Sequence, residues 1–188
     1  MNIIKVTALC LSAAVLSACD DHYHEELEAP YIHYWEVVDS YGHSNLRFNT
    51  FQESHGVFSQ NLFIDPLLDN GYFELWWDVS SYDDYSAGIY INDRPSLIGA
   101  YELDTAYCGY GRSCDHSGFA YCHFNSHTAN PYLNGSDTLS CSTRRADNTH
   151  FDITPLFTGH PNNLYMILEV CDNDSGLCDS QAQKVTFE

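Results

Sequence analysis

An alternation of apolar and polar residues with a period of two runs through most of the chain and limits its fold more than any other feature. From Tyr31 onward, apolar residues recur at every second position within short runs, and Gly, Asn, Asp or Pro residues separate the runs. Successive side chains of a β-strand point to opposite faces, so this pattern is typical of strands with one face in a core. The runs are 31–38, 56–64, 71–80, 87–92, 96–103, 118–124, 138–143, 150–157, 163–171 and 183–188.

These ten runs and the scarcity of helical periodicity predict an all-β domain over residues 31–188. We expect a disulfide-stabilised β-sandwich of the immunoglobulin-like type, with a β-barrel as the alternative. TPLF at 154–157 is compatible with one helical turn. Aromatic residues make up 14% of the 188 residues and charged residues 18%, which is the composition of a folded chain with a sizeable core.

The N-terminal residues follow a different pattern. Residues 3–16 are mostly apolar, with Lys5 as their charge. A membrane-spanning helix needs about 20 mostly apolar residues, so this run is too short, whereas it fits the ~7–15-residue core of a secretory signal. Residues 20–30, DDHYHEELEAP, contain five acids and no Lys or Arg, and we expect them to form a solvated tether.

The residues LSAC at 16–19 resemble the lipobox of bacterial lipoproteins, in which the cysteine becomes the first mature residue. The resemblance ends at Cys19 and implies a signal peptide at 1–18, a diacylglycerol thioether on Cys19 and usually a further acyl chain such as palmitate. It implies a lipid-anchored protein on the periplasmic face of the cell envelope, with 19–30 as lipidated cysteine and tether. Asp20 resembles the signal that retains lipoproteins in the inner membrane. An ordinary cleaved signal is the alternative.

Acidic residues far outnumber basic ones in this chain. There are 26 Asp and Glu residues and 7 Lys and Arg residues, for a net charge of −19. Cleavage after residue 18 would remove Lys5 and leave 6 basic and 26 acidic residues, or −20. Clustered Lys and Arg supply most nucleic-acid affinity, so nucleic acid is excluded as a partner. Anionic lipid surfaces also repel this chain, so membrane attachment is expected from the lipid alone.

The cysteines predict crosslinks. Cys10 lies in the signal and Cys19 is the lipidation site, so six cysteines remain: Cys108, Cys114, Cys122, Cys141, Cys171 and Cys178. An even number in an exported chain predicts three disulfides, for which fifteen connectivities exist. Short loops favour Cys108–Cys114 and Cys171–Cys178, which leaves Cys122–Cys141. Zinc is disfavoured because no spacing matches a close C-x₂₋₄-C pair.

The run GYFELWWDVS at 71–80 holds the best candidate for a ligand-binding surface. Alternation separates Phe73, Leu75, Trp77 and Val79 from Tyr72, Glu74, Trp76 and Asp78. The first set is expected in the core, so Trp76 and Trp77 cannot both be buried there. We expect the N-terminal segment or a loop to cover Trp76. An exposed Trp76 would instead stack on a sugar ring, with neighbouring carboxylates accepting hydroxyl protons.

The stretch SSYDDYS at 80–86 is expected to be a recognition loop, and it adds Tyr82 and Tyr85 to this candidate surface. A glycosidase pair is disfavoured, because Glu74 and Asp78 would lie roughly 13 Å apart along a strand, beyond the known separations of about 5–5.5 or 6.5–9.5 Å. No nucleophile motif is present either.

The sequence evidence for a metal site is also weak. Asp172, Asp174 and Asp179 begin like a calcium loop but lack its later acidic ligands, so they are minor candidates. The spacing of His123 and His127 suits a helix, yet the pair falls at a strand end. No metal and no cofactor is expected.

The functional expectation is therefore a lipid-anchored envelope domain without catalysis. We expect a protein-interaction or assembly module with an envelope protein partner. The alternative is a carbohydrate-binding module centred on Trp76, and a hydrolase is less favoured because the catalytic motifs are missing.

Overall fold

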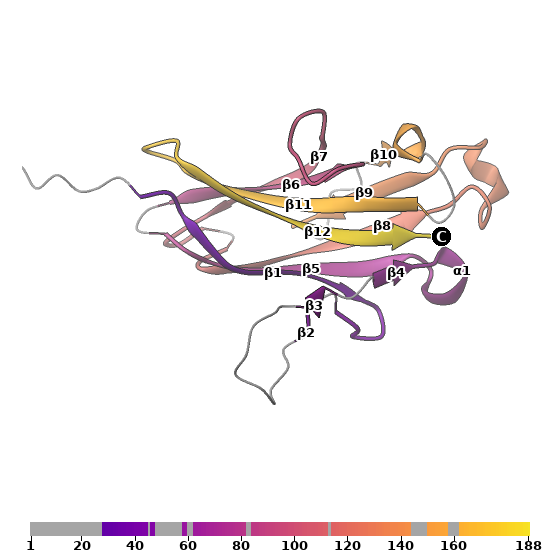
Figure 1. Ribbon diagram of the computed structural model, residues 1–188, viewed down its shortest axis with the longest axis horizontal. Coiled ribbons are helices and arrows are strands. Elements are labelled where there is room, and N and C mark those ends of the chain that lie inside the picture. Colours follow the sequence, from indigo (N-terminus) through magenta and orange to yellow (C-terminus); the bar gives the residue numbers. More distant parts are fainter. Residues whose placement is uncertain are drawn as a thin grey trace, which may run out of the picture.

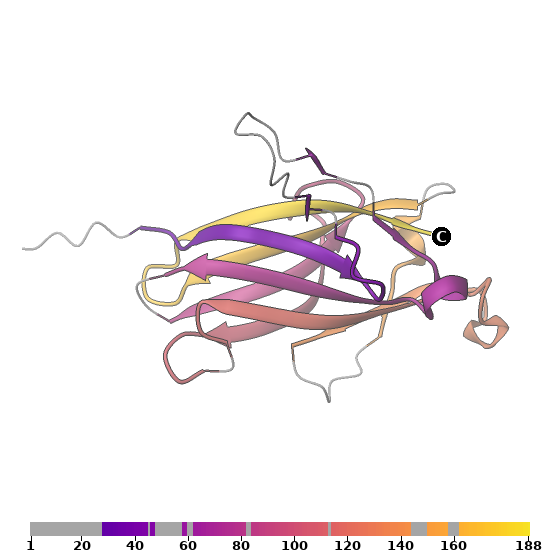
Figure 2. The same cartoon turned by 90° about the horizontal axis from the view of Figure 1, so that it is seen from below.

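The structure, a computed structural model, describes residues 28–44, 46–47, 58–59, 62–81, 84–112, 114–143, 150–157 and 162–188. The signal segment, Cys19, most of the tether and Tyr82 lie outside the described residues. The described residues form two five-stranded sheets that pack face to face, together with a two-stranded ribbon (Figure 1, Figure 2).

The elements are as follows. The first sheet contains, in spatial order, β1 (Tyr31–Asp39), β5 (Tyr72–Ser80), β8 (Ser117–Asn125), β9 (Thr138–Ser142) and β10 (Phe151–Asp152). The second contains β4 (Leu62–Ile64), β12 (Cys178–Phe187), β11 (Asn162–Asp172), β6 (Tyr85–Asn92) and β7 (Tyr101–Cys108). The ribbon is β2 (Leu46–Arg47) with β3 (Phe58–Ser59), and the short helices are α1 (Pro66–Asp69), η1 (Pro131–Leu133) and η2 (Thr154–Leu156).

This arrangement confirms the predicted all-β sandwich, and the barrel alternative is wrong because the strands form two separate sheets. Neighbouring strands are antiparallel except β4, which runs parallel to β12. The order β12-β11-β6 corresponds to G-F-C of an immunoglobulin sheet. The other sheet departs from the immunoglobulin order A-B-E-D, because β8, the first strand after β7, already lies beside β5.

Some strand limits differ from the prediction. The run 96–103 becomes a strand only at Tyr101, because a turn precedes it: Gly99 has a φ of 79°, and Ala100 donates its N–H to the carbonyl of Leu97 at 3.1 Å. The last strand begins at Cys178 and not at residue 183. The predicted helical turn at 154–157 is confirmed as η2.

The core lies between the sheets and is built by the predicted alternation. The inward-facing residues of β5, which are Phe73, Leu75, Trp77 and Val79, are all at most 2% exposed. Trp35 of β1 lies opposite Trp77 in the register, and its indole Nε1 donates to the Met166 carbonyl of the other sheet at 3.4 Å. Full burial of each large apolar side chain contributes about 1.5–3 kcal/mol.

Side chains link the two sheets along both lateral edges. On one side, Gln181 and Gln183 of β12 each donate from Nε2 to a carbonyl of β1 at 3.0 Å. The N–H of Ile32 also donates to the Asp179 carboxylate at 3.1 Å. On the other side, Thr143 after β9 donates its N–H and hydroxyl to Asp104 of β7. These bonds occupy edge groups that could otherwise pair with another strand.

All three predicted disulfides are confirmed. Cys108–Cys114 closes the loop after β7, Cys122–Cys141 joins opposite positions of β8 and β9, and Cys171–Cys178 closes the β11–β12 hairpin.

Three connections meet at one end of the sandwich, which we call the loop end. They are the segments after β5, after β7 and after β11, and β1 also begins there (Figure 2). The opposite end, called the far end, carries α1 and η1 (Figure 1).

Candidate functional site

The outer surface of β5 and β8 carries two neighbouring groups of exposed rings. The strand register pairs Tyr72 with His123, places Tyr121 beside Glu74, and pairs Trp76 with Phe119. Tyr72 is 53% exposed, Trp76 38%, Phe119 42% and Tyr121 41%. We call Tyr72, Trp76, Phe119, Tyr121 and His123 the aromatic face. It exists because alternation turns these residues outward on two strands that the fold makes neighbours.

The rings of the aromatic face contact one another in two groups, a pair and a group of three. Tyr72 and His123 are stacked, with ring centroids 4.1 Å apart and planes 7° apart. Trp76 and Phe119 have centroids 5.4 Å apart. Phe119 and Tyr121 lie 5.3 Å apart and meet edge to face at 79°. Such contacts hold each ring in place, so the surface is ordered but not planar.

The side chain of Trp76 is 38% exposed, so no described segment covers it completely, and the N-terminal segment that was expected to do so lies mostly outside the described residues. Its indole Nε1 donates to Glu74 Oε2 at 2.9 Å, which orients the ring against the sheet. Asp78, the next outward residue of β5, accepts a hydrogen bond from the Ser117 hydroxyl at 2.8 Å. Of the six predicted site residues, Tyr72, Glu74, Trp76 and Asp78 therefore share one outer surface.

Carboxylates border this surface on the β1 side. Glu36 of β1 lies opposite Trp76 in the register, and Tyr34 lies opposite Asp78. Burial raises the pKa of Tyr34, and the negative charges of Glu36 and Asp78 raise this pKa further. The aromatic face is thus bordered by an electronegative margin.

His123 presents a neutral ring at the other end of the aromatic face. Burial lowers the pKa of its imidazole, and repulsion from His150 acts in the same direction. A hydrogen bond between Nε2 and the carbonyl of Asn70, 3.0 Å long, opposes the change. Near neutral pH the uncharged form is favoured, which suits its stacking on Tyr72.

The structure places Tyr85 differently from the prediction. It is the first residue of β6 and only 1% exposed, so it belongs to the core and not to a recognition loop. Its hydroxyl donates to the carbonyl of Asp115 at 2.8 Å. Burial raises the pKa of Tyr85 to about 12, and the negative charges of Asp115 and Asp78 act in the same direction. Tyr82 lies outside the described residues.

A hollow of about 560 Å³ opens at the loop end. Residues from all three connections line it, among them Asp84, Tyr110, Arg112, Asp115 and Asp174. The predicted aromatic and acidic loop contributes Ser81, Asp84 and Tyr85 to the lining. The other walls come from the predicted disulfide loop after β7 and from the hairpin that carries Asp174, and the sequence did not indicate that these segments meet. No short motif could have revealed it, because its walls are distant in sequence.

The weak calcium candidates do not converge on a common point. Asp172 Oδ1 accepts the N–H groups of Asp174 and Ser175, so it closes the hairpin turn, and these bonds lower the pKa of Asp172, that from Ser175 most strongly. Asp179 instead accepts from the N–H of Ile32 on β1. The three carboxylates therefore do not form one group of potential metal ligands in this structure.

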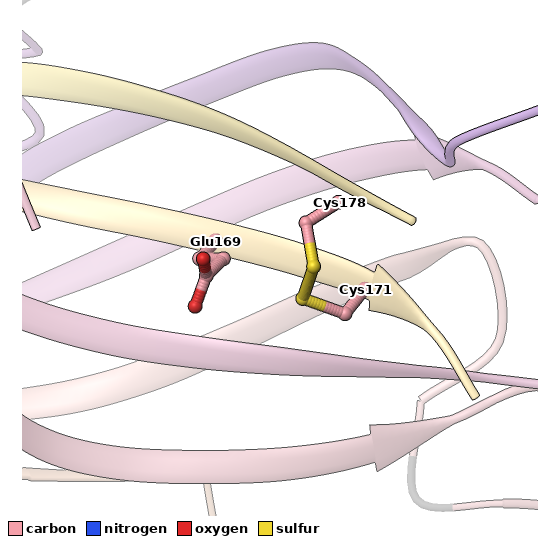
Figure 3. A group of neighbouring side chains, drawn as sticks. All are labelled: Glu169, Cys171 and Cys178. Carbon is pink, nitrogen blue, oxygen red and sulfur yellow. A yellow bond between two sulfur atoms is a disulfide. The ribbon is translucent and has the colours of Figure 1, made fainter. Parts of the chain in front are cut away.

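Within the described ranges, the one group of potential metal ligands that converges is Glu169 with Cys171 and Cys178. Figure 3 shows that the two sulfur atoms are bonded to each other. A metal-binding cysteine acts as a thiolate, and neither sulfur is available in that form. The group is a crosslink beside an acid and not a metal centre.

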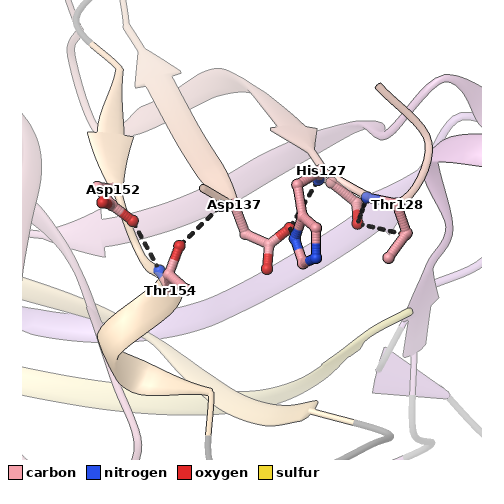
Figure 4. Close-up of polar contacts among 6 residues, drawn as sticks. His127, Thr128, Asp137, Asp152 and Thr154 are labelled. Carbon is pink, nitrogen blue, oxygen red and sulfur yellow. Dashed lines mark hydrogen bonds and ion pairs between the residues drawn. The ribbon is translucent and has the colours of Figure 1, made fainter. Parts of the chain in front are cut away.

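A polar cluster at the far end was not predicted. Figure 4 shows Asp137 beside His127, with Thr154 and Asp152 on its other side. Asp137 is 4% exposed, and its Oδ1 accepts a hydrogen bond from the backbone N–H of His127 at 2.8 Å. The same oxygen lies 2.8 Å from Nδ1 of the His127 ring. Its own N–H donates to the Thr154 hydroxyl at 2.7 Å. The cluster ties the β8–β9 connection to η2, so His127 and His123 have separate roles.

The comparisons with known proteins give no further assignment. No protein-family model, no curated protein and no solved structure matches the chain. Among the residues that the structure describes, no helix is long and apolar enough to cross a membrane.

Proposed function

We propose that the chain is a bacterial envelope lipoprotein whose sandwich is a non-catalytic binding module, and that the aromatic face docks a protein partner. The lipobox at 16–19 supports the anchor, which would hold the domain at the periplasmic surface of the membrane. If Asp20 acts as the retention signal, that membrane is the inner one.

The observation that carries the proposal is the contiguity of the exposed rings. Single exposed apolar residues are normal on a protein surface, whereas a connected group marks an interaction site. Trp and Tyr dominate the binding energy of protein interfaces, and the mutual ring contacts reduce the entropy that would be lost on docking. Here Trp76, Phe119 and Tyr121 form such a connected group on two rigid strands.

The charge distribution indicates the chemistry of the partner. The aromatic face is bordered by Glu36, Glu74 and Asp78, and the whole chain carries a net charge of −19. A surface with Lys and Arg residues complements both features, since a cation can lie over an indole while it faces a carboxylate. The proposed partner is therefore an envelope protein with a basic surface.

A glycan is the second candidate, and the exposure of Trp76 beside Glu74 and Asp78 favours it. Two observations favour a protein instead. Phe119 and Tyr121 are nearly perpendicular, whereas stacking on successive sugar rings needs ring faces that one chain can reach together. The Trp76 N–H already donates to Glu74 and is not free for a sugar hydroxyl.

The test replaces Phe119 with a benzophenone amino acid in living cells of the source organism and identifies crosslinked proteins. The matched control places the same group at Tyr101, which is 38% exposed like Trp76 but lies on β7 of the other sheet. We expect a specific crosslink from position 119 that is absent from position 101 and lost with Trp76→Ala. Equal crosslinking from both positions would refute the docking surface.

Two further measurements separate the remaining readings. Glycan-array binding that disappears with Trp76→Ala would support the carbohydrate alternative. Labelling with a palmitate analogue that is lost in Cys19→Ser would support the anchor, and retention of residues 1–18 in the mature protein would contradict it.

A further inference from the structure

The hollow at the loop end is a preformed cavity, separate from the aromatic face. Its volume of about 560 Å³ is within the usual range of ligand pockets, roughly 300–1,000 Å³. Its walls come from the connections after β5, β7 and β11.

Asp84 joins these three connections. Its carbonyl accepts the N–H of Asn173 at 3.0 Å, and its carboxylate oxygen Oδ2 accepts from Nε of Arg112 at 3.0 Å. Nη2 of the same guanidinium group also lies 3.0 Å from Asp84 Oδ2. Gly109 permits this approach, because its φ is +125° and a Cβ there would lie 2.1 Å from Asp84 Oδ1.

Two further features hold the β7–β8 wall. The disulfide Cys108–Cys114 closes that loop, and the buried Tyr85 hydroxyl donates to the carbonyl of Asp115 from below. These contacts restrain the described residues of the cavity wall, and such restraint lowers the entropy cost of binding.

The charges around the hollow do not balance. The guanidinium of Arg112 is already matched by Asp84. The carboxylate of Asp115 lies 4.0 Å from the imidazole of His116, and Asp174 adds a further carboxylate to the lining. Tyr110, which is 97% exposed, adds an aromatic wall at the mouth. Two carboxylates beside an aromatic ring form a complement to an organic cation.

We propose that this hollow binds a primary ammonium or guanidinium group presented on a short peptide segment. The identity of that segment as part of the basic partner rests on the proposed function, whereas binding of the cationic group itself does not. The two surfaces adjoin along β5 and β8: Asp78 and Ser117 lie between the Trp76–Phe119 pair and the His116 wall of the hollow. One basic partner segment can reach both.

The test measures binding of an end-blocked tri-lysine peptide to the folded protein by calorimetry. The same peptide with acetylated lysine side chains is the ligand control. The variant Asp115→Asn/Asp174→Asn removes the two carboxylates of the hollow without changing side-chain size. Its matched control is Asp65→Asn/Asp93→Asn, which makes the same charge change before α1 and just after β6, at positions outside the lining of the hollow.

We expect saturable binding of the tri-lysine peptide that weakens about tenfold in the hollow variant and less than about twofold in the control variant. The acetylated peptide should not bind. Equal weakening in both variants would mean diffuse attraction to an acidic protein and would overturn the proposal. An absence of saturable binding, or equal binding of the acetylated peptide, would overturn it as well.

The variant Trp76→Ala distinguishes this proposal from the proposed function. We expect it to abolish the crosslink from position 119 and to leave tri-lysine binding unchanged. Suppose that Trp76→Ala abolishes the crosslink, but that tri-lysine binding is unchanged in Asp115→Asn/Asp174→Asn. This result would support the docking surface and refute the hollow as a binding site. The reverse result would sustain the hollow and refute the docking surface.

Discussion

At the scale of single residues, the two adjacent tryptophans of β5 differ only in the side of the strand that they occupy. Trp77 is fully buried against Trp35, whereas Trp76 is 38% exposed and bonded to Glu74. Truncating Trp77 would leave a large cavity between the sheets, whereas truncating Trp76 would remove a partly exposed ring and its hydrogen bond to Glu74.

We therefore predict that the two substitutions differ strongly in their effect on stability. Trp77→Ala should lower the free energy of unfolding by about 3–5 kcal/mol, and Trp76→Ala by less than about 1 kcal/mol. Urea unfolding followed by circular dichroism measures both values. A loss of more than about 2 kcal/mol in Trp76→Ala would show that this side chain is structural and that its variants cannot report on binding.

Tyr85 makes a second prediction at this scale, which concerns alkaline pH. The pKa of Tyr85 in the folded protein is raised to about 12, from an ordinary value of 10.0. The folded state thus holds this proton more tightly than the unfolded chain, so stability is complete below pH 10.0 and declines as the pH rises toward about 12. Tyr85→Phe should reduce the slope of unfolding free energy against pH in this window.

Tyr90, whose pKa burial and Glu169 also raise to about 12, should preserve part of the slope in Tyr85→Phe. Tyr132→Phe is the control, because Tyr132 is 89% exposed and should leave the slope unchanged. An identical slope in Tyr85→Phe and the unmodified protein would contradict the assignment of the buried hydroxyl.

At the scale of elements, alternation was sufficient to predict most strands but not their neighbours. GFAYCHF at 118–124 shows the same period as 71–80, yet only the structure places β8 beside β5 and completes the aromatic face. Tyr85 was assigned to a loop because the acids before it resemble turn residues, whereas β6 begins at this tyrosine. Pairing is decided by long-range packing, which a local pattern does not contain.

The three disulfides close loops of different length, and this difference gives an element-scale prediction. Cys122–Cys141 spans 19 residues, whereas Cys108–Cys114 and Cys171–Cys178 span 6 and 7. Loop-closure entropy gives about 3 kcal/mol for the first and just over 2 kcal/mol for each of the others. Paired Cys→Ala variants in urea unfolding should follow this order, and a smallest loss for Cys122→Ala/Cys141→Ala would contradict it.

At the scale of the whole molecule, the sequence predicted the fold class and the disulfides correctly but did not indicate the cavity. The charge balance and the number of cysteines are sums over the chain, and the strand period is a local pattern. All three can therefore be determined from the sequence without a structure. The hollow needs Asp84, Arg112 and Asn173 to meet from three connections, and that meeting depends on the order of the strands in both sheets.

The net charge makes the last prediction. At pH 7 the chain carries −19, and the ion pairs of Arg94 and Arg112 in the described residues are local and partly exposed, so self-repulsion should dominate its electrostatics. Salt shortens the screening length from about 10 Å at 0.1 M to about 3 Å at 1 M and should therefore stabilise the fold. We expect the thermal midpoint at pH 7 to rise by several degrees between low salt and about 0.5 M sodium chloride.

The control for this effect is the same salt series near pH 4.5, the isoelectric point of the chain. There the repulsion is absent, so any remaining rise measures the action of salt on apolar burial alone. A midpoint that falls with salt at pH 7 would show that attractive ion pairs outweigh repulsion. It would also weaken the case for a basic partner, because that case assumes an uncompensated negative field around the domain.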